Sequence, residues 1–288
     1  MERMNGFLEK VRKEAPLVHN ITNYVTVNDC ANILLACGAS PIMTDDIQEV
    51  EDITSICSAL VINLGTLNER TVEAMIKAGK KANKLRHPVI LDPVGAGASG
   101  FRTETAVRLL KEISFTAIRG NISEIKTISQ GFGSTKGVDA DAADRITAEN
   151  LNEAAVFAGD LARETKAVII ITGPIDLITD GHKAYAVRNG HPLMSRITST
   201  GCMLTAVTGA FLAANTEKLT EAAAVAVCIM GICGELAYEK MTETEGGTAS
   251  FRMHLIDFAS KIKEDTIIDR ARISEIPISR KGDCLESK

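Results

Sequence analysis

Short apolar segments alternate with longer segments of helical periodicity along most of the chain. The apolar segments are bounded by Gly, Pro or polar residues, as is typical of strands buried in a sheet. This βαβ alternation predicts an α/β fold, with a central, mainly parallel sheet and helices on both faces in a three-layer αβα sandwich. The expected strands are Ala59–Asn63, Pro88–Asp92, Thr116–Arg119 and Ala167–Thr172, and the expected helices are Glu69–Leu85, Glu104–Ile113 and Ala148–Glu164.

The pattern changes after Thr172, where two short alternating runs flank Asp180-Gly181, a hairpin signal. Three helical stretches follow. Because no linker, repeat or low-complexity segment separates these parts, we expect one domain over residues 1–268. The charged residues 269–288 lack periodicity and are predicted to form a loosely held tail. The two runs are Pro174–Thr179 and His182–Arg188, and the helical stretches are about Thr200–Asn215, Leu219–Lys240 and Thr248–Lys263.

Composition narrows the class of protein. Of the 288 residues, 45% are hydrophobic and 24% charged, which is typical of a globular protein with a real core. The net charge of -5 and the lack of a Lys/Arg-rich block give no support to nucleic-acid binding. The amino-terminal segment lacks the apolar core of a signal peptide, and the apolar runs Cys202–Asn215 and Ala222–Ala237 look too short to span a bilayer. We therefore expect a cytoplasmic protein without a membrane partner.

The seven cysteines form no CxxC pair. Most of them read as small buried hydrophobic residues in a reducing compartment.

Polar residues and glycines follow the predicted strands. In open parallel sheets, ligands bind beyond the carboxyl ends of the strands. A binding site is therefore expected at this edge. The segments that would form it are Asn63-Leu-Gly65, Asp92-Pro-Val-Gly95, Arg119-Gly-Asn121 and Thr172-Gly173.

The segment Thr198-Ser-Thr-Gly-Cys202 opens an apolar helical stretch. Backbone N–H groups at a helix start, here around Thr200 and Gly201, favour an anion such as a transferring phosphoryl group. The alternative is an ordinary helix cap, because Ser and Thr are common there. The helix start is expected to favour the thiolate of Cys202, which could accept or polarise the proton of an alcohol. The alternative for Cys202 is a packed core cysteine.

Two carboxylates, Asp92 and Glu124, follow adjacent predicted strands. Such a pair could hold a hydrated Mg²⁺ between phosphates. Asn121 and Glu124 also have the spacing of a capping box, so a purely structural role for this pair stays open.

The glycines of Gly95-Ala-Gly97-Ala-Ser-Gly100 formally match a dinucleotide fingerprint. That motif requires the glycines to turn the strand directly into a helix, with an acidic residue ending the next strand. Here the helix is expected to start only near Thr103, and the next strand ends in Arg119. We therefore reject an NAD site, and the absence of G-x-x-x-x-G-K-[ST] excludes a P-loop.

Five segments occur in the chain in this order: Val18-His-Asn-Ile-Thr-Asn23, Gly38-Ala-Ser-Pro-Ile-Met43, Leu91-Asp-Pro-Val-Gly-Ala-Gly97, Arg119-Gly-Asn-Ile-Ser-Glu124 and Ser199-Thr-Gly-Cys202. Together they closely resemble the hydroxyethylthiazole kinase family, within the ribokinase-like superfamily. The resemblance extends from about residue 5 to about residue 263. It implies a ribokinase-like fold, ATP as co-substrate with Mg²⁺, and a thiazole alcohol as acceptor. It also implies a homotrimer with its active sites at the subunit interfaces.

The resemblance also implies roles for single residues. Met43 would contact the thiazole, Gly201 would lie against the substrate and the phosphate, and Cys202 would lie beside the acceptor hydroxyl. The remaining residues would form three sites. Asn23 and Gly65 would belong to the thiazole pocket, and Asp92 and Glu124 would bind the metal. The nucleotide would be bound by Arg119, Thr172, Gly173 and Asn121.

The sequence departs from its relatives at two loop positions. Related superfamily kinases carry an Asp base where this chain has Cys202, and thiazole kinases more often have Gly at position 199, where this chain has Ser. The alternatives are another ribokinase-like enzyme, such as a hydroxymethylpyrimidine or pyridoxal kinase or an NAD(P)H-hydrate dehydratase, and a silent thiazole or nucleotide sensor. The Cys at position 202 argues against the first group.

Overall fold

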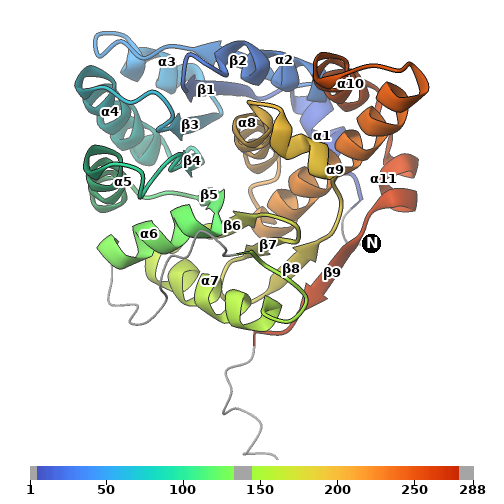
Figure 1. Ribbon diagram of the computed structural model, residues 1–288. Coiled ribbons are helices and arrows are strands. Elements are labelled where there is room, and N and C mark those ends of the chain that lie inside the picture. Colours follow the sequence, from blue (N-terminus) through green and yellow to red (C-terminus); the bar gives the residue numbers. More distant parts are fainter. Residues whose placement is uncertain (1–4, 133–144, 279–288) are drawn as a thin grey trace, which may run out of the picture.

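A nine-stranded sheet runs through the part of the protein that the computed structural model describes, residues 5–132 and 145–278 (Figure 1). Its order is β2-β1-β3-β4-β5-β6-β7-β8-β9. All neighbours from β2 to β6 are parallel, and β7, β8 and β9 are added antiparallel. The strands are β1 Leu17–Ile21, β2 Ser40–Met43, β3 Ala59–Asn63, β4 Val89–Asp92, β5 Ala117–Asn121, β6 Val168–Thr172, β7 Asp176–Thr179, β8 Ala184–Val187 and β9 Ile273–Ile276.

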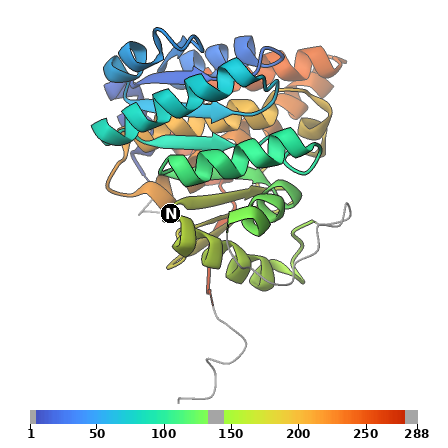
Figure 2. The same cartoon turned by 90° about the vertical axis from the view of Figure 1, so that its left-hand side faces the viewer.

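Helices cover both faces of this sheet (Figures 1 and 2). One face carries α1 Phe7–Glu14, α2 Val27–Cys37, α8 Thr200–Ala214, α9 Leu219–Glu243, α10 Thr248–Lys261 and α11 Glu264–Arg270. The other face, turned toward the viewer in Figure 2, carries α3 Val50–Ile56, α4 Glu69–Leu85, α5 Gly100–Glu112, α6 Ile122–Phe132 and α7 Leu151–Thr165. The predicted three-layer αβα architecture is confirmed.

The two helical layers enclose two separate cores. Val61 of β3 packs into the core under α8 and α9, whereas its neighbours Leu60 and Ile62 pack into the core under α4 and α5. Successive side chains of a strand point to opposite faces, so a strand covered on both sides is apolar at every position. This explains why the central strands read as continuous apolar runs in the sequence.

The expected elements agree with the structure apart from their ends. The helix Glu69–Leu85 and the strand Ala59–Asn63 have the predicted bounds, and the hairpin around Asp180-Gly181 is present as β7 and β8. The helix expected near Thr103 begins earlier, at Gly100, because the Ser99 hydroxyl accepts a hydrogen bond from the Arg102 N–H at 3.3 Å and caps it.

The carboxyl-terminal prediction needs correction. Residues 269–278 complete α11 and form β9, which pairs antiparallel with β8. A loosely held tail is therefore wrong for these residues, because the open edge of β8 supplies hydrogen-bond partners that the charge pattern does not reveal. Residues 279–288 lie outside the described part of the chain.

The apolar run of α9 is longer than expected. By length and composition, this helix of 25 residues is long and apolar enough to cross a membrane, whereas its apolar run was expected to be too short. However, 78% of its most apolar window is buried inside the fold. Its hydrophobic character is therefore explained by its place in the core beside β6, β7 and β8.

Candidate active site

Two neighbouring strands bring Asn63 and Asp92 side by side at the carboxyl edge of the sheet. The Asn63 amide donates to Asp92 Oδ2 at 2.9 Å, and its Oδ1 accepts from Asn23 Nδ2 at 2.9 Å. Both amides also lie close to Cys202, with Asn63 Nδ2 at 3.3 Å and Asn23 Nδ2 at 3.4 Å from Sγ. These contacts hold the thiol at the edge where a ligand is expected.

The start of α8 presents unpaired backbone donors to the same edge. The first helical hydrogen bond runs from Met203 N–H to the Ser199 carbonyl at 2.7 Å. Among the described residues, no acceptor is found for the N–H groups of Thr200, Gly201 and Cys202. The Thr200 hydroxyl donates to the Met194 carbonyl at 3.0 Å. The predicted anion site is therefore made of backbone amides and the positive end of the helix.

Arg119 adds a cation beside these amides. A Cβ on Gly201 would lie only 2.5 Å from Arg119 Nη1, so the guanidinium rests directly against this glycine. Its Nη2 donates to the Thr172 hydroxyl at 2.7 Å, and its Nη1 lies 3.6 Å from Asp92 Oδ2. A guanidinium held next to free amides is well suited to bind phosphate.

The thiol of Cys202 is neutral in this setting. Burial raises its pKa, the charge of Asp92 raises it further, and hydrogen bonds from Asn23 and Asn63 lower it only in part. The expectation that the helix start favours the thiolate is therefore wrong. Desolvation of a charged sulfur is the largest cause of the raised pKa of Cys202.

Asp92 is completely buried. Burial raises its pKa to about 6, against the opposing charge of Arg119 and with a contribution from Glu124 in the same direction. Its Oδ2 accepts from Asn63 and from the Thr205 hydroxyl at 2.7 Å, whereas Oδ1 is buried without a hydrogen-bond partner. Asp92 thus anchors several side chains and keeps one oxygen uncommitted.

Glu124 and Asn121 form the capping box that their spacing predicts. Asn121 N–H donates to Glu124 Oε2 at 2.9 Å, Glu124 N–H donates to Asn121 Oδ1 at 2.8 Å, and Gly95 N–H donates to Glu124 Oε1 at 2.9 Å. Each carboxylate oxygen retains a second lone pair.

The carboxylates of Asp92 and Glu124 fit a hydrated magnesium ion better than a metal whose ligands all come from the protein. Mg²⁺ usually keeps several waters and takes only one or two protein carboxylates. Glu124 is partly exposed and has lone pairs to spare, and Asp92 has an unpartnered oxygen. Among the described residues, no group of three or more His, Cys, Asp or Glu side chains is placed to enclose a metal.

A small cavity of about 220 Å³ opens beside the network, at the ends of β1, β2 and β3. Asn63 and Met43 line it, together with apolar side chains such as Val27 and Met75. Gly65 adjoins the cavity, and a Cβ there would lie 2.6 Å from Asn23 Nδ2. Glycine is thus required for Asn23 to reach Asn63 and Cys202. The volume suits a small ring, and the lining offers it apolar surface together with polar groups such as Asn20 and Thr44.

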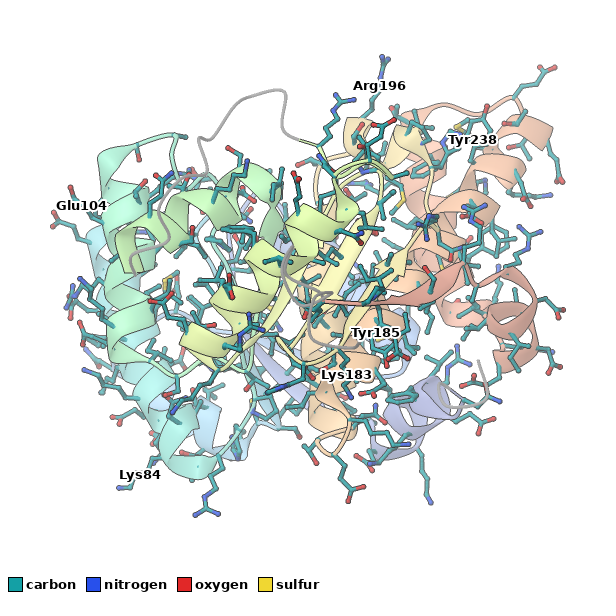
Figure 3. The ribbon with its side chains drawn as sticks, turned by 90° about the horizontal axis from the view of Figure 1, so that it is seen from below. Lys84, Glu104, Lys183, Tyr185, Arg196 and Tyr238 are labelled. Carbon is teal, nitrogen blue, oxygen red and sulfur yellow. The ribbon has the colours of Figure 1, made fainter. Side chains whose placement is uncertain are left out.

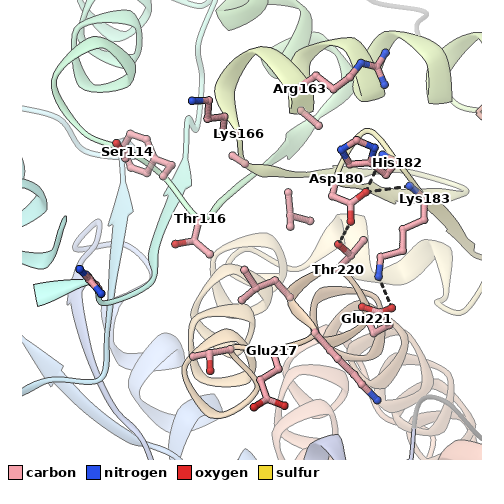
Figure 4. Close-up of a pocket in the computed structure, with 18 of the residues that line it drawn as sticks. Ser114, Thr116, Arg163, Lys166, Asp180, His182, Lys183, Glu217, Thr220 and Glu221 are labelled. Carbon is pink, nitrogen blue, oxygen red and sulfur yellow. Dashed lines mark hydrogen bonds and ion pairs between the residues drawn. The ribbon is translucent and has the colours of Figure 1, made fainter.

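A larger cavity of about 750 Å³ lies at the opposite edge of the sheet, and the predicted site residues do not line it (Figure 4). Some of its polar side chains contact one another. Lys183 binds Glu221 at 2.5 Å, and Asp180 accepts from Thr220 at 2.7 Å. Tyr185, which Figure 3 shows beside Lys183, also donates to Glu221. The described residues that line this groove include the start of α9, but no cysteine and none of the predicted site residues.

The hydroxyethylthiazole kinase family matches residues 8–265 of the chain. The chain belongs to this family.

Curated relatives align with this chain over almost their whole length. The hydroxyethylthiazole kinase of Clostridium acetobutylicum is 59% identical over 92% of this chain and 97% of its own, and that of Clostridium beijerinckii is 51% identical over 95% and 98%. The solved structure of a hydroxyethylthiazole kinase protein from Pyrococcus horikoshii aligns with a TM-score of 0.85 at 36% identity, covering 96% of this chain and all of that one.

More distant structures share the fold alone. A pyridoxal kinase from Staphylococcus aureus aligns with a TM-score of 0.55 at 16% identity, over 91% of this chain and 98% of that one. This likeness, together with the Pyrococcus structure, confirms the ribokinase-like α/β architecture.

Two residues of this family member acquire roles that the sequence did not suggest. Asn63 was expected only as one polar group at the edge, yet it joins Asn23, Asp92 and Cys202. Thr205 carried no signal at all, because a Thr one turn into an apolar helix looks like any core residue. Its contact with Asp92 depends on how α8 crosses β4.

Proposed function

We propose that this protein transfers the γ-phosphoryl group of ATP to the primary hydroxyl of 4-methyl-5-(2-hydroxyethyl)thiazole, yielding the thiazole phosphate used in cytoplasmic thiamine salvage. The observation that carries the proposal is the meeting of three features at one edge. They are the unpaired amides at the start of α8, the guanidinium of Arg119, and the Cys202 thiol near a small cavity of mixed polar and apolar lining. The family membership and the names of the relatives support this substrate.

Catalysis then rests on position and charge. The N–H groups of Thr200, Gly201 and Cys202 would stabilise the charge on the transferring phosphoryl group, as Arg119 would from the side of β5. The neutral Cys202 thiol would orient the acceptor hydroxyl but, because its sulfur already carries a proton, would not act as the base. The hydroxyl proton would pass late in the reaction to an oxygen of the transferred phosphoryl group. A loose transition state requires little proton removal before the attack.

The two substrates would occupy adjoining parts of the edge. Met43 and its cavity would hold the thiazole ring, with Asn23 and Gly65 shaping the wall behind it. The nucleotide would lie over the ends of β5 and β6, where Arg119 and Thr172 are already hydrogen-bonded to each other. The backbone of Gly173 and the side chain of Asn121 are exposed at the same strand ends.

Magnesium is part of the same proposal. Glu124 and the free oxygen of Asp92 would hold the hydrated ion. Its chemistry would be to neutralise charge on the nucleotide phosphates.

A homotrimer with shared active sites is proposed as well. Tyr24, which lines the thiazole cavity, is 79% exposed, and Val25 beside it is 58% exposed. Leu35 of α2 and Met253 of α10 are also exposed, on helices that pack together. Apolar side chains of this size around an open cavity are typical of a surface covered by a partner. Sedimentation of the purified protein tests this, and a monomer would contradict it.

The test of function is ADP release from Mg²⁺-ATP with hydroxyethylthiazole, hydroxymethylpyrimidine, pyridoxal or no acceptor. Release that depends on the thiazole alcohol is the expected result. Release with one of the other alcohols would retain the phosphate site but overturn the substrate. A folded protein that binds ATP and releases no ADP with any acceptor would instead be a silent sensor.

A further inference from the structure

Ser199 has an unusual backbone conformation for its position. Its φ of 83° lies in the left-handed region that L-residues other than glycine rarely adopt. The other non-glycine residues with positive φ in the described chain are exposed and follow the ends of helices, where this conformation is common. They are Ala15, Arg86, Lys166 and Glu245. Ser199 is buried and stands at the start of a helix.

The side chain of Ser199 supplies a compensating contact. Its hydroxyl donates to Oδ2 of Asp29 at 2.5 Å, a hydrogen bond to a carboxylate and hence a strong one. Asp29 belongs to α2 and is 6% exposed. Arg252 of α10 lies 3.5 Å from the same carboxylate oxygen and balances its charge. A contact among α2, α8 and α10 thus holds a residue that glycine could replace without strain.

Ser199 directly precedes the amides assigned above to phosphate binding. A change of its backbone angles turns the peptide that carries the Thr200 N–H, and with it the carbonyl that accepts the first helical hydrogen bond. The direction of these donors is thus coupled to whether Ser199 stays in the left-handed region.

We propose that Ser199 and Asp29, balanced by Arg252, are positioning residues for phosphoryl transfer. Their contact, the Ser199–Asp29 brace, holds the amides of residues 200–202 in the direction that binds the transferring group. This inference rests on the proposed kinase function, because it assigns these amides to the phosphoryl group. A residue with a Cβ at position 199 is strained at positive φ and needs the contact with Asp29 to stay there, whereas glycine does not. The inference therefore predicts that loss of the Ser199 hydroxyl harms catalysis in an alanine variant but not in a glycine variant.

A pair of substitutions at one position separates this role from simple packing. Ser199→Ala keeps the Cβ and loses the hydroxyl, so kcat is expected to fall about tenfold as the amides shift. Ser199→Gly also loses the hydroxyl but accepts a positive φ freely, so kcat should stay within about twofold of the wild type. Equal losses in the two variants would overturn the proposal.

Asp29→Ala provides an independent test by rescue. This variant leaves Ser199 strained and unanchored, so kcat should again fall about tenfold while the KM for the thiazole stays within about twofold. Adding Ser199→Gly to Asp29→Ala should restore most of the kcat. A double variant no better than Asp29→Ala would refute the brace, as would wild-type kcat in the single variant.

Thr220→Ala is the matched control. Thr220 donates to Asp180 Oδ2 at 2.7 Å near the start of α9, the same kind of contact at the opposite edge of the sheet. Its loss should lower the melting temperature and leave kcat unchanged.

Hydrogen exchange of residues 199–204 gives a readout that needs no turnover. The hydrogen-bonded amides of Met203 and Leu204 should exchange faster in Ser199→Ala and Asp29→Ala than in Ser199→Gly and the double variant. A wild-type protein without kinase activity would refute the function, whereas unchanged exchange in all variants would refute the brace.

Discussion

Replacement of Gly201 by alanine tests the contact between the start of α8 and Arg119. The added Cβ would lie 2.5 Å from Arg119 Nη1 and 2.8 Å from Nη2, about 1 Å inside ordinary van der Waals contact. The guanidinium cannot yield without loss, because it is hydrogen-bonded to Thr172 and paired with the buried Asp92. Gly201→Ala should therefore displace the cation from the amides that are proposed to bind the phosphate.

The expected loss follows from that displacement. A hydrogen bond to a charged group contributes about 1.5–3 kcal/mol, which corresponds to roughly a 10- to 100-fold loss in kcat/KM for ATP. Stability should fall less than activity, because the preference for alanine over glycine in a helix, up to about 1 kcal/mol, offsets part of the cost of disturbing the pair of Arg119 with the buried Asp92. Activity should thus drop in a protein that still folds.

Steady-state ADP release at varied ATP measures this loss. Gly247→Ala is the control, since a Cβ there would meet nothing within 4 Å. Combining Gly201→Ala with Arg119→Ala should cost little beyond Arg119→Ala alone, because the group that is displaced has already been removed. Wild-type kcat/KM in folded Gly201→Ala, or strict additivity in the double variant, would refute the reasoning.

Three further predictions concern the thiol, the buried carboxylate and the thiazole cavity. Cys202→Ser should retain kinase activity, because the neutral thiol is proposed only to orient the hydroxyl; complete loss in a folded protein would contradict this. Asp92 has a folded-state pKa of about 6, above its unfolded value, so its contribution to stability is lost as pH rises through 6. The difference in unfolding free energy between wild type and Asp92→Asn, from urea titrations without nucleotide, should therefore change by up to about 3 kcal/mol between pH 4 and pH 7; a constant difference would exclude this titration. Met43→Ala should raise the KM for the thiazole about tenfold and leave that for ATP unchanged, and equal changes in both would place Met43 outside the thiazole site.

Much of this protein was readable from local patterns in the sequence. Continuous apolar runs between glycines and polar residues predicted the buried parallel strands, because a strand covered on both faces must be apolar at every position. The rule that ligands bind at the carboxyl ends of strands then directed attention to Asp92, Arg119 and Thr172. The spacing of Asn121 and Glu124 likewise predicted the capping box that the structure contains.

The contacts that define the site were decided only by the tertiary structure. Cys202 meets Asn23 and Asn63 from strands and loops far away in the chain, and no local pattern encodes such a meeting. The state of its thiol was predicted with the wrong sign, because a helix start is a local feature, whereas burial depends on everything packed around the sulfur. In the same way, the sequence marked Ser199 as a departure from glycine. Only the packing of α2 against α8 supplied Asp29, whose carboxylate makes a serine tolerable there.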